Sequence, residues 1–190
     1  VGSEMCIRDR YITFGIRESQ DVRPWIELHN REFGPYPVFL GGVSMGATTV
    51  LMAAGTPLPD NVRGILADCG FSSPREILTS VAKHRAHLPA FPILYLANFW
   101  CRLLAGFDWM ENSTVQAMAR NRLPVFFAHG QADDFVPWSM TQAAYDAAAC
   151  DKQLLLVPGA GHGRSYLVER ERYLHMLEDF LNRNLPASST

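Results

Sequence analysis

Apolar positions follow two kinds of pattern along the chain. Four short runs are continuously apolar, as are strands buried on both faces of a parallel sheet. We expect strands at residues 38–43, 62–67, 124–128 and 154–157. Elsewhere apolar residues recur every three or four positions, which is the spacing of amphipathic helices. This spacing predicts helices over 20–33, 47–54 and 166–185. Strands that alternate with helices predict an α/β fold with a doubly wound, mostly parallel sheet.

The first and last predicted helices carry further expectations. Pro24 has no amide hydrogen and fits best in the first turn of a helix, which places the start of the first helix near Asp21. The last helix is expected to bury one apolar side. That side consists of Leu167, Val168, Leu174, Leu177, Phe180 and Leu181.

The region 72–119, between the second and third expected strands, is too long for a simple crossover connection. It contains Pro74, Pro89 and Pro92 and a dense set of aromatic residues: Phe91, Tyr95, Phe99, Trp100, Phe107 and Trp109. We interpret the region as an inserted helical cap. The alternative is two ordinary helices packed against the sheet.

Composition excludes several classes of protein. The chain has 190 residues, of which 48% are hydrophobic and 19% charged, as expected for one globular domain. A net charge of -2 and the absence of a Lys/Arg run argue against nucleic-acid binding. The longest apolar stretch, 88–104, is interrupted by two prolines, Asn98 and Arg102, and does not resemble a membrane span.

No metal or cofactor is expected. The four cysteines form no CxxC pair, which argues against a zinc site or a disulfide framework. His84 and His87 lack an evident third ligand, so we interpret them as surface or cap residues. The sequence contains neither a GxGxxG motif nor a P-loop.

A candidate nucleophile lies between the first expected strand and the helix that follows it. Gly42-Val43-Ser44-Met45-Gly46 matches the pattern G-x-S-x-G, in which the serine occupies a sharp, strained turn. Such a turn requires small residues two positions to either side of the serine. The N-terminus of the following helix stabilises negative charge that develops near Ser44.

A serine nucleophile needs a histidine base, and that histidine needs a carboxylate. His162 lies among glycines after the last strand and is our candidate base, whereas His129 is interpreted as a structural histidine. The other histidines lie in helical patterns. Three acids are open on this reasoning: Asp133, Asp134 and Asp68.

The chain order Ser44, Asp133, His162 is that of the α/β-hydrolase triad. From about Tyr11 to Leu185 the chain resembles bacterial α/β-hydrolases of the uncharacterised esterase type, close to serine-aminopeptidase-like sequences. The resemblance rests on five motifs: residues 12–15 (ITFG), 42–46 (GVSMG), 67–71 (ADCGF), 129–137 (HGQADDFVP) and 159–162 (GAGH). In the fourth motif Asp133 takes the acid position.

This resemblance implies a serine hydrolase that cleaves a small-molecule carboxylic ester through an acyl-enzyme, with the Met45 amide as one oxyanion donor. One alternative is a peptidase of the same fold that acts on an amide. Another is a non-catalytic binding member of the fold or an inactive fragment. The sequence does not determine substrate identity, cellular location or oligomeric state.

The resemblance also implies that the chain is N-terminally truncated. Residues 1–10 resemble a translated sequencing adapter, and the family's first strands do not precede the elbow. We therefore expect a core at 11–71 and 120–185, a cap at 72–119 and a tail at 186–190. The second oxyanion donor and any membrane anchor are expected in the missing segment. Without it, residues 38–43 form an open sheet edge, and we expect poor solubility and little activity.

Overall fold

The computed structural model describes residues 12–110 and 112–186, so the predicted adapter segment and most of the predicted tail lie outside it. Four strands form one sheet in the order β1-β2-β3-β4. They are β1 (Val38–Val43), β2 (Val62–Asp68), β3 (Val125–Gly130) and β4 (Lys152–Val157). All three strand pairs are parallel, which confirms the predicted fold class. In the described residues the outer edge of β1 pairs with no strand.

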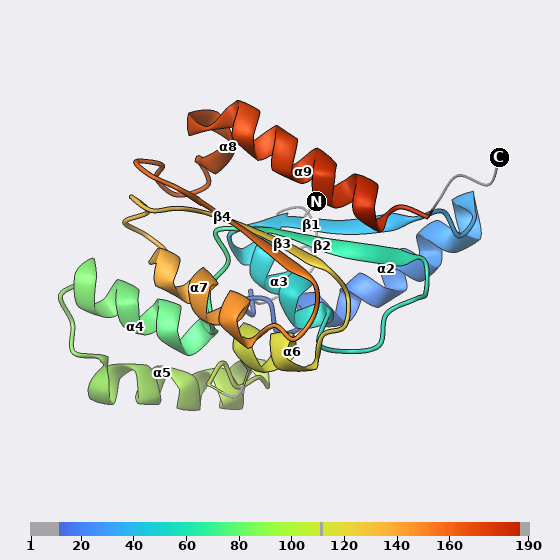
Figure 1. The fold of residues 1–190 in the computed structure, drawn as a ribbon. Helices are drawn as coiled ribbons and strands as arrows, with labels where there is room; N and C mark the ends of the chain where they lie inside the picture. The colour runs from blue at the N-terminus through green and yellow to red at the C-terminus, as the bar shows by residue number, and fades with distance from the viewer. Residues whose placement is uncertain (1–11, 111, 187–190) are drawn as a thin grey trace.

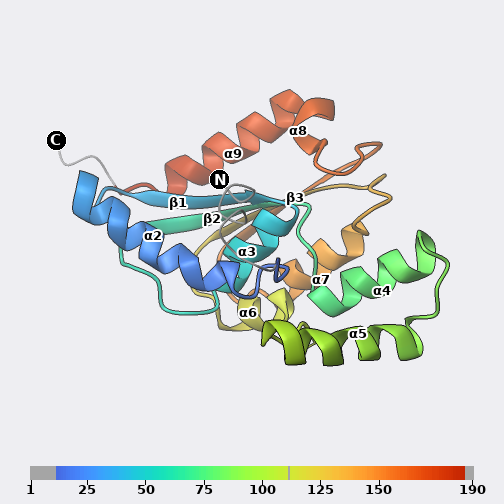
Figure 2. The ribbon, with the colours of Figure 1, turned by 180° about the vertical axis from the view of Figure 1, so that it is seen from behind.

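Helices cover both faces of the sheet (Figure 1). One face carries α2 (Glu18–Phe33), α3 (Met45–Ala53), α6 (Thr114–Arg120) and α7 (Trp138–Ala147). The other face carries α8 (Ser165–Val168) and α9 (Arg170–Asn184). A hairpin of α4 (Pro74–His84) and α5 (Ala90–Ala105) lies beside the first of these layers, as the view from behind also shows (Figure 2).

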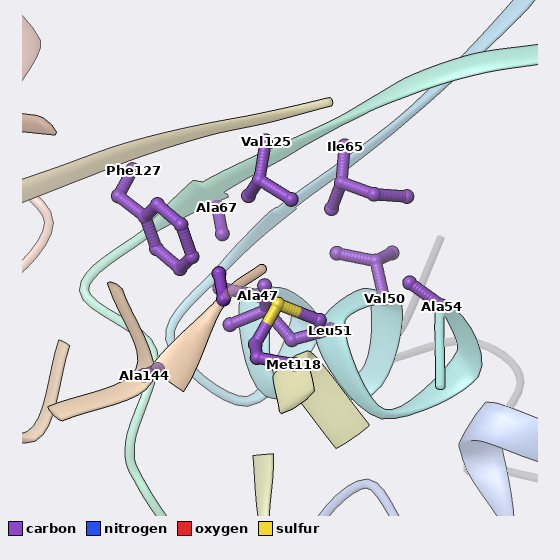
Figure 3. Packing of buried hydrophobic residues seen from close by; sticks show 11 residues of the cluster. Ala47, Val50, Leu51, Ala54, Ile65, Ala67, Met118, Val125, Phe127 and Ala144 are labelled. Atoms are coloured by element: carbon purple, nitrogen blue, oxygen red, sulfur yellow. The ribbon is translucent and has the colours of Figure 1, made fainter. Parts of the chain in front are cut away.

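The largest core cluster lies between the sheet and α3. Ile65 on β2 and Val125 and Phe127 on β3 are completely buried, and their side chains face α3 and Met118 of α6 (Figure 3). Burying one such side chain contributes about 1.5–3 kcal/mol to the free energy of unfolding. The cluster therefore fixes the position of α3, the helix whose N-terminus adjoins Ser44.

The start of α2 differs from the prediction. The helix begins at Glu18 rather than near Asp21, and Pro24 lies in its second turn. The Glu18 carboxylate accepts hydrogen bonds from the amides of Thr13 (2.8 Å) and Gly15 (3.0 Å). These bonds fasten the chain ahead of the helix, and α2 accommodates a proline in its interior.

The single helix predicted over 166–185 is wrong. Glu169, with φ -122° and ψ 58°, separates α8 from α9. The break changes the direction of the chain, so that Leu167 and Val168 do not share a face with α9 and are 71% and 51% exposed. Of the six residues expected on the buried side, Phe180 is the one that is fully buried.

The two ends of the predicted cap region lie together. The Thr114 hydroxyl lies 2.9 Å from the carbonyl oxygens of Phe71 and Ser72, and the Ser113 hydroxyl donates to Ser72. Such closure is the geometry expected of an insertion. The division into core and cap stays a prediction.

No helix within 12–110 or 112–186 has both the length and the apolar character needed to cross a bilayer.

Candidate active site

Ser44 joins the end of β1 to the start of α3. It has φ 55° and ψ -117°, a conformation that a non-glycine residue adopts only when its surroundings enforce it. A β-carbon on Gly42 would lie 2.2 Å from the carbonyl carbon of Gly46, so residue 42 has to be glycine. A β-carbon on Gly46 would meet no described atom within 4 Å. The expectation that both neighbours must be small is therefore met at Gly42 and wrong at Gly46.

His162 lies in the loop after β4, and the structure brings it to Ser44. Its Nε2 is 2.9 Å from Ser44 Oγ, and its Nδ1 is 2.7 Å from Asp133 Oδ2. A carboxylate on the Nδ1 side favours the tautomer with the proton on Nδ1, which leaves Nε2 free to accept the hydroxyl proton of Ser44. The side chain of His162 is 27% exposed, so it remains open to a small substrate.

Asp133 is held by the turn that follows β3. Its side chain is completely buried, and the amides of Phe135 and Val136 donate to Oδ1, both at 2.9 Å. Burial alone would raise the pKa of this carboxyl. Hydrogen bonds from His129, His162 and the two amides outweigh burial and lower the pKa to about 2. The carboxylate therefore stays ionised beside His162.

His129 contributes more to this site than the sequence indicated. It is fully buried on β3, and its Nε2 lies 2.9 Å from the Val136 carbonyl and 3.2 Å from Asp133 Oδ2. A carbonyl oxygen only accepts, so Nε2 carries a proton. Its Nδ1 lies 2.7 Å from the Thr141 hydroxyl. The signal for this role is the spacing of four residues between His129 and Asp133.

The other two acids are placed elsewhere. Asp134 is 84% exposed and pairs with Arg85 at 3.2 Å. Asp68 is buried at the end of β2, where the Ser165 hydroxyl donates to it at 3.3 Å, and burial raises its pKa. Among these three acids, Asp133 is the one with a hydrogen bond to His162 in the described residues.

The candidate oxyanion donor, Met45, is the first residue of α3. Amides in the first turn of a helix have no acceptor within the helix, and the helix dipole adds partial positive charge at the same point. The Ser44 amide donates to the Asp68 carbonyl at 2.8 Å, which fixes the elbow against β2. The role of the Met45 amide as an oxyanion donor stays a prediction.

The tip of α4 contacts the loop that carries Asp133. The guanidinium carbon of Arg85 lies 5.2 Å from the centre of the Phe135 ring. The same ring packs edge-on against His162, with ring centres 5.1 Å apart. A continuous line of contacts therefore joins the α4–α5 hairpin to the candidate base. Nothing in the sequence pattern indicated these contacts.

One cluster in the described part of the chain has the composition of a metal site. Cys69, Asp133 and His162 offer ligand atoms within 4.8 Å of one another. Cys69 is fully buried, and burial, followed by the negative charge of Asp68, raises the pKa of its thiol to about 12. A metal ligand has to be the thiolate, and the other two residues are hydrogen-bonded to each other. The donors fit a metal ion poorly.

Comparison with sequences gives relatives without an assigned function. No family model matches the chain. The uncharacterized protein YqkD of Bacillus subtilis is 29% identical over 171 residues, which is 90% of this chain and 56% of YqkD. The uncharacterized protein YfhR of Escherichia coli O157:H7 is 21% identical over 159 residues, which is 81% of this chain and 50% of YfhR. The chain thus spans about half the length of these relatives.

Comparison with solved structures identifies the fold. The Pyrococcus furiosus esterase Pf2001 has a TM-score of 0.70 at 18% identity, covering 93% of this chain and 66% of the esterase. A puromycin-hydrolyzing peptidase of Mycobacterium tuberculosis has a TM-score of 0.70 at 22% identity, covering 91% and 26%. The acylaminoacyl peptidase of Pyrococcus horikoshii has a TM-score of 0.63 at 18% identity, covering 93% and 29%.

Proposed function

We propose that this chain, which has the α/β-hydrolase fold, is the catalytic part of a serine hydrolase that cleaves carboxylic esters. The observation that carries the proposal is the continuous set of hydrogen bonds from Ser44 through His162 to Asp133. Three loops at the carboxyl ends of three parallel strands supply these residues. The strained backbone of Ser44 holds its hydroxyl within hydrogen-bond distance of His162 Nε2.

In the proposed reaction, Ser44 Oγ attacks the carbonyl carbon of the ester while His162 Nε2 takes its proton. The buried, ionised Asp133 stabilises the resulting imidazolium. The Met45 amide donates to the oxyanion. Collapse of the intermediate expels the alcohol, which takes the proton from His162. Water then attacks the acyl-enzyme by the same route and releases the acid.

The proposed substrate is a small-molecule ester with an apolar acyl or alcohol group. This part of the proposal rests on the Phe135 ring, which packs against His162 with ring centres 5.1 Å apart and is contacted by Arg85 of the hairpin. The second candidate function is cleavage of an aminoacyl amide. Rates on a matched pair of an aryl ester and an aryl amide of the same acyl group separate the two.

The decisive experiment labels the nucleophile without assuming a substrate. A fluorophosphonate forms a covalent bond with an activated serine, so we expect labelling of the chain at Ser44, located by peptide mass spectrometry. Ser44→Ala should abolish labelling and ester turnover, whereas Ser139→Ala, which changes an exposed serine, should leave both intact. Labelling of Ser44→Ala at the rate of the parent chain contradicts the proposal.

A further inference from the structure

The helix α5 places one polar residue inward and most of its large apolar residues outward. Asn98 is its one fully buried residue, and it donates to Asp108 Oδ1 at 2.9 Å and accepts from the Trp109 amide at 3.3 Å. The large apolar side chains of the same helix, apart from Leu94, point outward. Six of them are 53–73% exposed: Phe91, Leu96, Phe99, Trp100, Leu103 and Leu104. A helix packed only against its own protein shows the opposite arrangement.

The exposed side chains form one continuous surface. Leu96, Trp100 and Leu104 follow one another at four-residue spacing, and Phe99 and Leu103 lie beside them, because an α-helix has about 3.6 residues per turn. A cavity of about 660 Å³ on this helix is lined by Phe99 and Leu103 but by none of Ser44, Asp133 and His162. We call the outward side of 91–104 the α5 face. Contiguous apolar surfaces of this kind mark sites of interaction.

Charge indicates what covers the α5 face. No acidic residue occurs between Glu76 and Asp108, although the chain as a whole has a net charge of -2. Arg85 and Arg102 pair with Asp134 and Asp108. Lys83 and the exposed His84 lie in the last turn of α4, and the exposed His87 follows before α5. Among the described residues, no ion pair joins Lys83 to an acid. A partner that complements the α5 face and the cationic end of α4 beside it has to be both anionic and apolar.

We propose that the α5 face docks on the surface of an anionic phospholipid bilayer, with α5 lying in the interface. Tyrosine and tryptophan side chains partition to that depth, and leucines next to them enter the acyl region. The face is the outward side of one helix, which a bilayer accommodates without a complementary groove. The sequence placed membrane attachment ahead of the chain, whereas the α5 face lies within it. The proposal does not depend on the proposed hydrolase activity.

Flotation with vesicles tests the proposal, because aggregated protein sinks and vesicle-bound protein rises. We expect the chain to float with vesicles of equimolar phosphatidylcholine and phosphatidylglycerol and less with phosphatidylcholine alone. Added salt should weaken the difference. Leu96→Glu and Trp100→Glu should each lower the bound-to-free ratio by about tenfold. Leu167→Glu changes an exposed leucine on α8 and should have no effect.

Three results overturn the proposal. The first is no flotation with the anionic vesicles. The second is flotation that Leu96→Glu and Trp100→Glu leave unchanged while circular dichroism shows them folded. The third is a concentration-dependent dimer in sedimentation that the same substitutions abolish, with no vesicle binding, which assigns the face to a second copy of the chain. Ser44→Ala should float like the parent chain, which separates membrane binding from hydrolysis.

Discussion

His129 and Asp133 are hydrogen-bonded inside the protein, with 3.2 Å between Nε2 and Oδ2, and the same oxygen contacts His162 at 2.7 Å. One carboxylate oxygen thus faces two histidines. His162 reaches solvent, and His129 does not. We infer that His129 is a positioning residue, which fixes Asp133 and through it His162.

Replacing this buried histidine should affect stability and turnover together. His129→Asn shortens the side chain and removes the contacts of Nε2 with the Val136 carbonyl and Asp133 Oδ2. We expect the free energy of unfolding to fall by about 1–3 kcal/mol, measured by urea denaturation. We also expect a lower kcat at unchanged KM. His175→Asn, on the exposed side of α9, is the control and should match the parent chain.

The three candidate acids can be ranked by one set of substitutions. Asp133→Asn should lower kcat by about three to four orders of magnitude, as the loss of the triad carboxylate does in serine proteases. Asp134→Asn should change kcat by less than about twofold, because its carboxylate is exposed. Asp68→Asn should retain most of the activity. Equal losses for Asp68→Asn and Asp133→Asn would contradict the assignment of Asp133.

Asp133 should also make the protein sensitive to acid. Its pKa is about 2 in the folded chain and about 3.9 in an unfolded one, so the folded state binds fewer protons between these values. Its contribution of about 2–3 kcal/mol is present above about pH 4 and is lost as the pH falls toward 2. Urea titrations across this range should show a smaller loss for Asp133→Asn than for the parent chain. If the parent chain and Asp133→Asn showed the same pH dependence, the ionised Asp133 carboxylate would not contribute to stability as described.

Asp68 should act in the opposite direction. Burial raises its pKa, so the folded state binds more protons than the unfolded state just above the ordinary pKa of aspartate. The charged carboxylate therefore costs stability at neutral pH, and that cost disappears on acidification. Asp68→Asn should be at least as stable as the parent chain at pH 7 and should lose its advantage near pH 4. The comparison needs only unfolding free energies at these two pH values.

The two glycines of the elbow should respond differently to the same change. Gly42→Ala places a methyl group on the backbone of Gly46 and should lower the free energy of unfolding by about 1–3 kcal/mol or more. Gly46→Ala adds a methyl group in open space inside α3 and should leave stability unchanged or raise it slightly. Thermal unfolding of the two variants side by side measures the contrast. Equal melting temperatures would show that the backbones of residues 42 and 46 can move apart to admit the methyl group of Gly42→Ala.

Arg85 offers a test of the link between the hairpin and the base. Arg85→Ala removes the ion pair with Asp134 and the contact with Phe135, whereas Arg85→Lys keeps the charge. We expect Arg85→Ala to lower kcat/KM by about two- to fivefold, because the Phe135 ring that packs against His162 loses its contact with the guanidinium, and Arg85→Lys to restore it in part. Both variants should unfold within about 0.5 kcal/mol of the parent chain, since the pair is exposed. Equal values of kcat/KM for the parent chain and Arg85→Ala would remove Arg85 from the site.

The predictability of this structure follows the range of the interactions involved. The four strands and the helix after Ser44 show in local apolar patterns, and Ser44 and His162 show in short glycine-rich motifs. The break at Glu169 has no such marker, because neither proline nor glycine accompanies it. The contacts of His129 with Val136 and of Arg85 with Phe135 depend on how loops fold back in space. The length and the proline and aromatic content of 72–119 predicted a helical cap and gave no sign that most large apolar side chains of α5 face outward.

Ser44 and His162 are 118 residues apart in sequence, and each follows one of the two outer strands of the sheet in the described residues. Their hydrogen bond therefore needs three parallel pairings, all of them non-local, to have formed. Non-local pairings form late in folding because the chain has to close long loops first. The reactivity of Ser44 should thus appear only when the last strand docks. The rate at which Ser44 becomes open to covalent labelling after dilution from denaturant would then report the rate at which the sheet is completed.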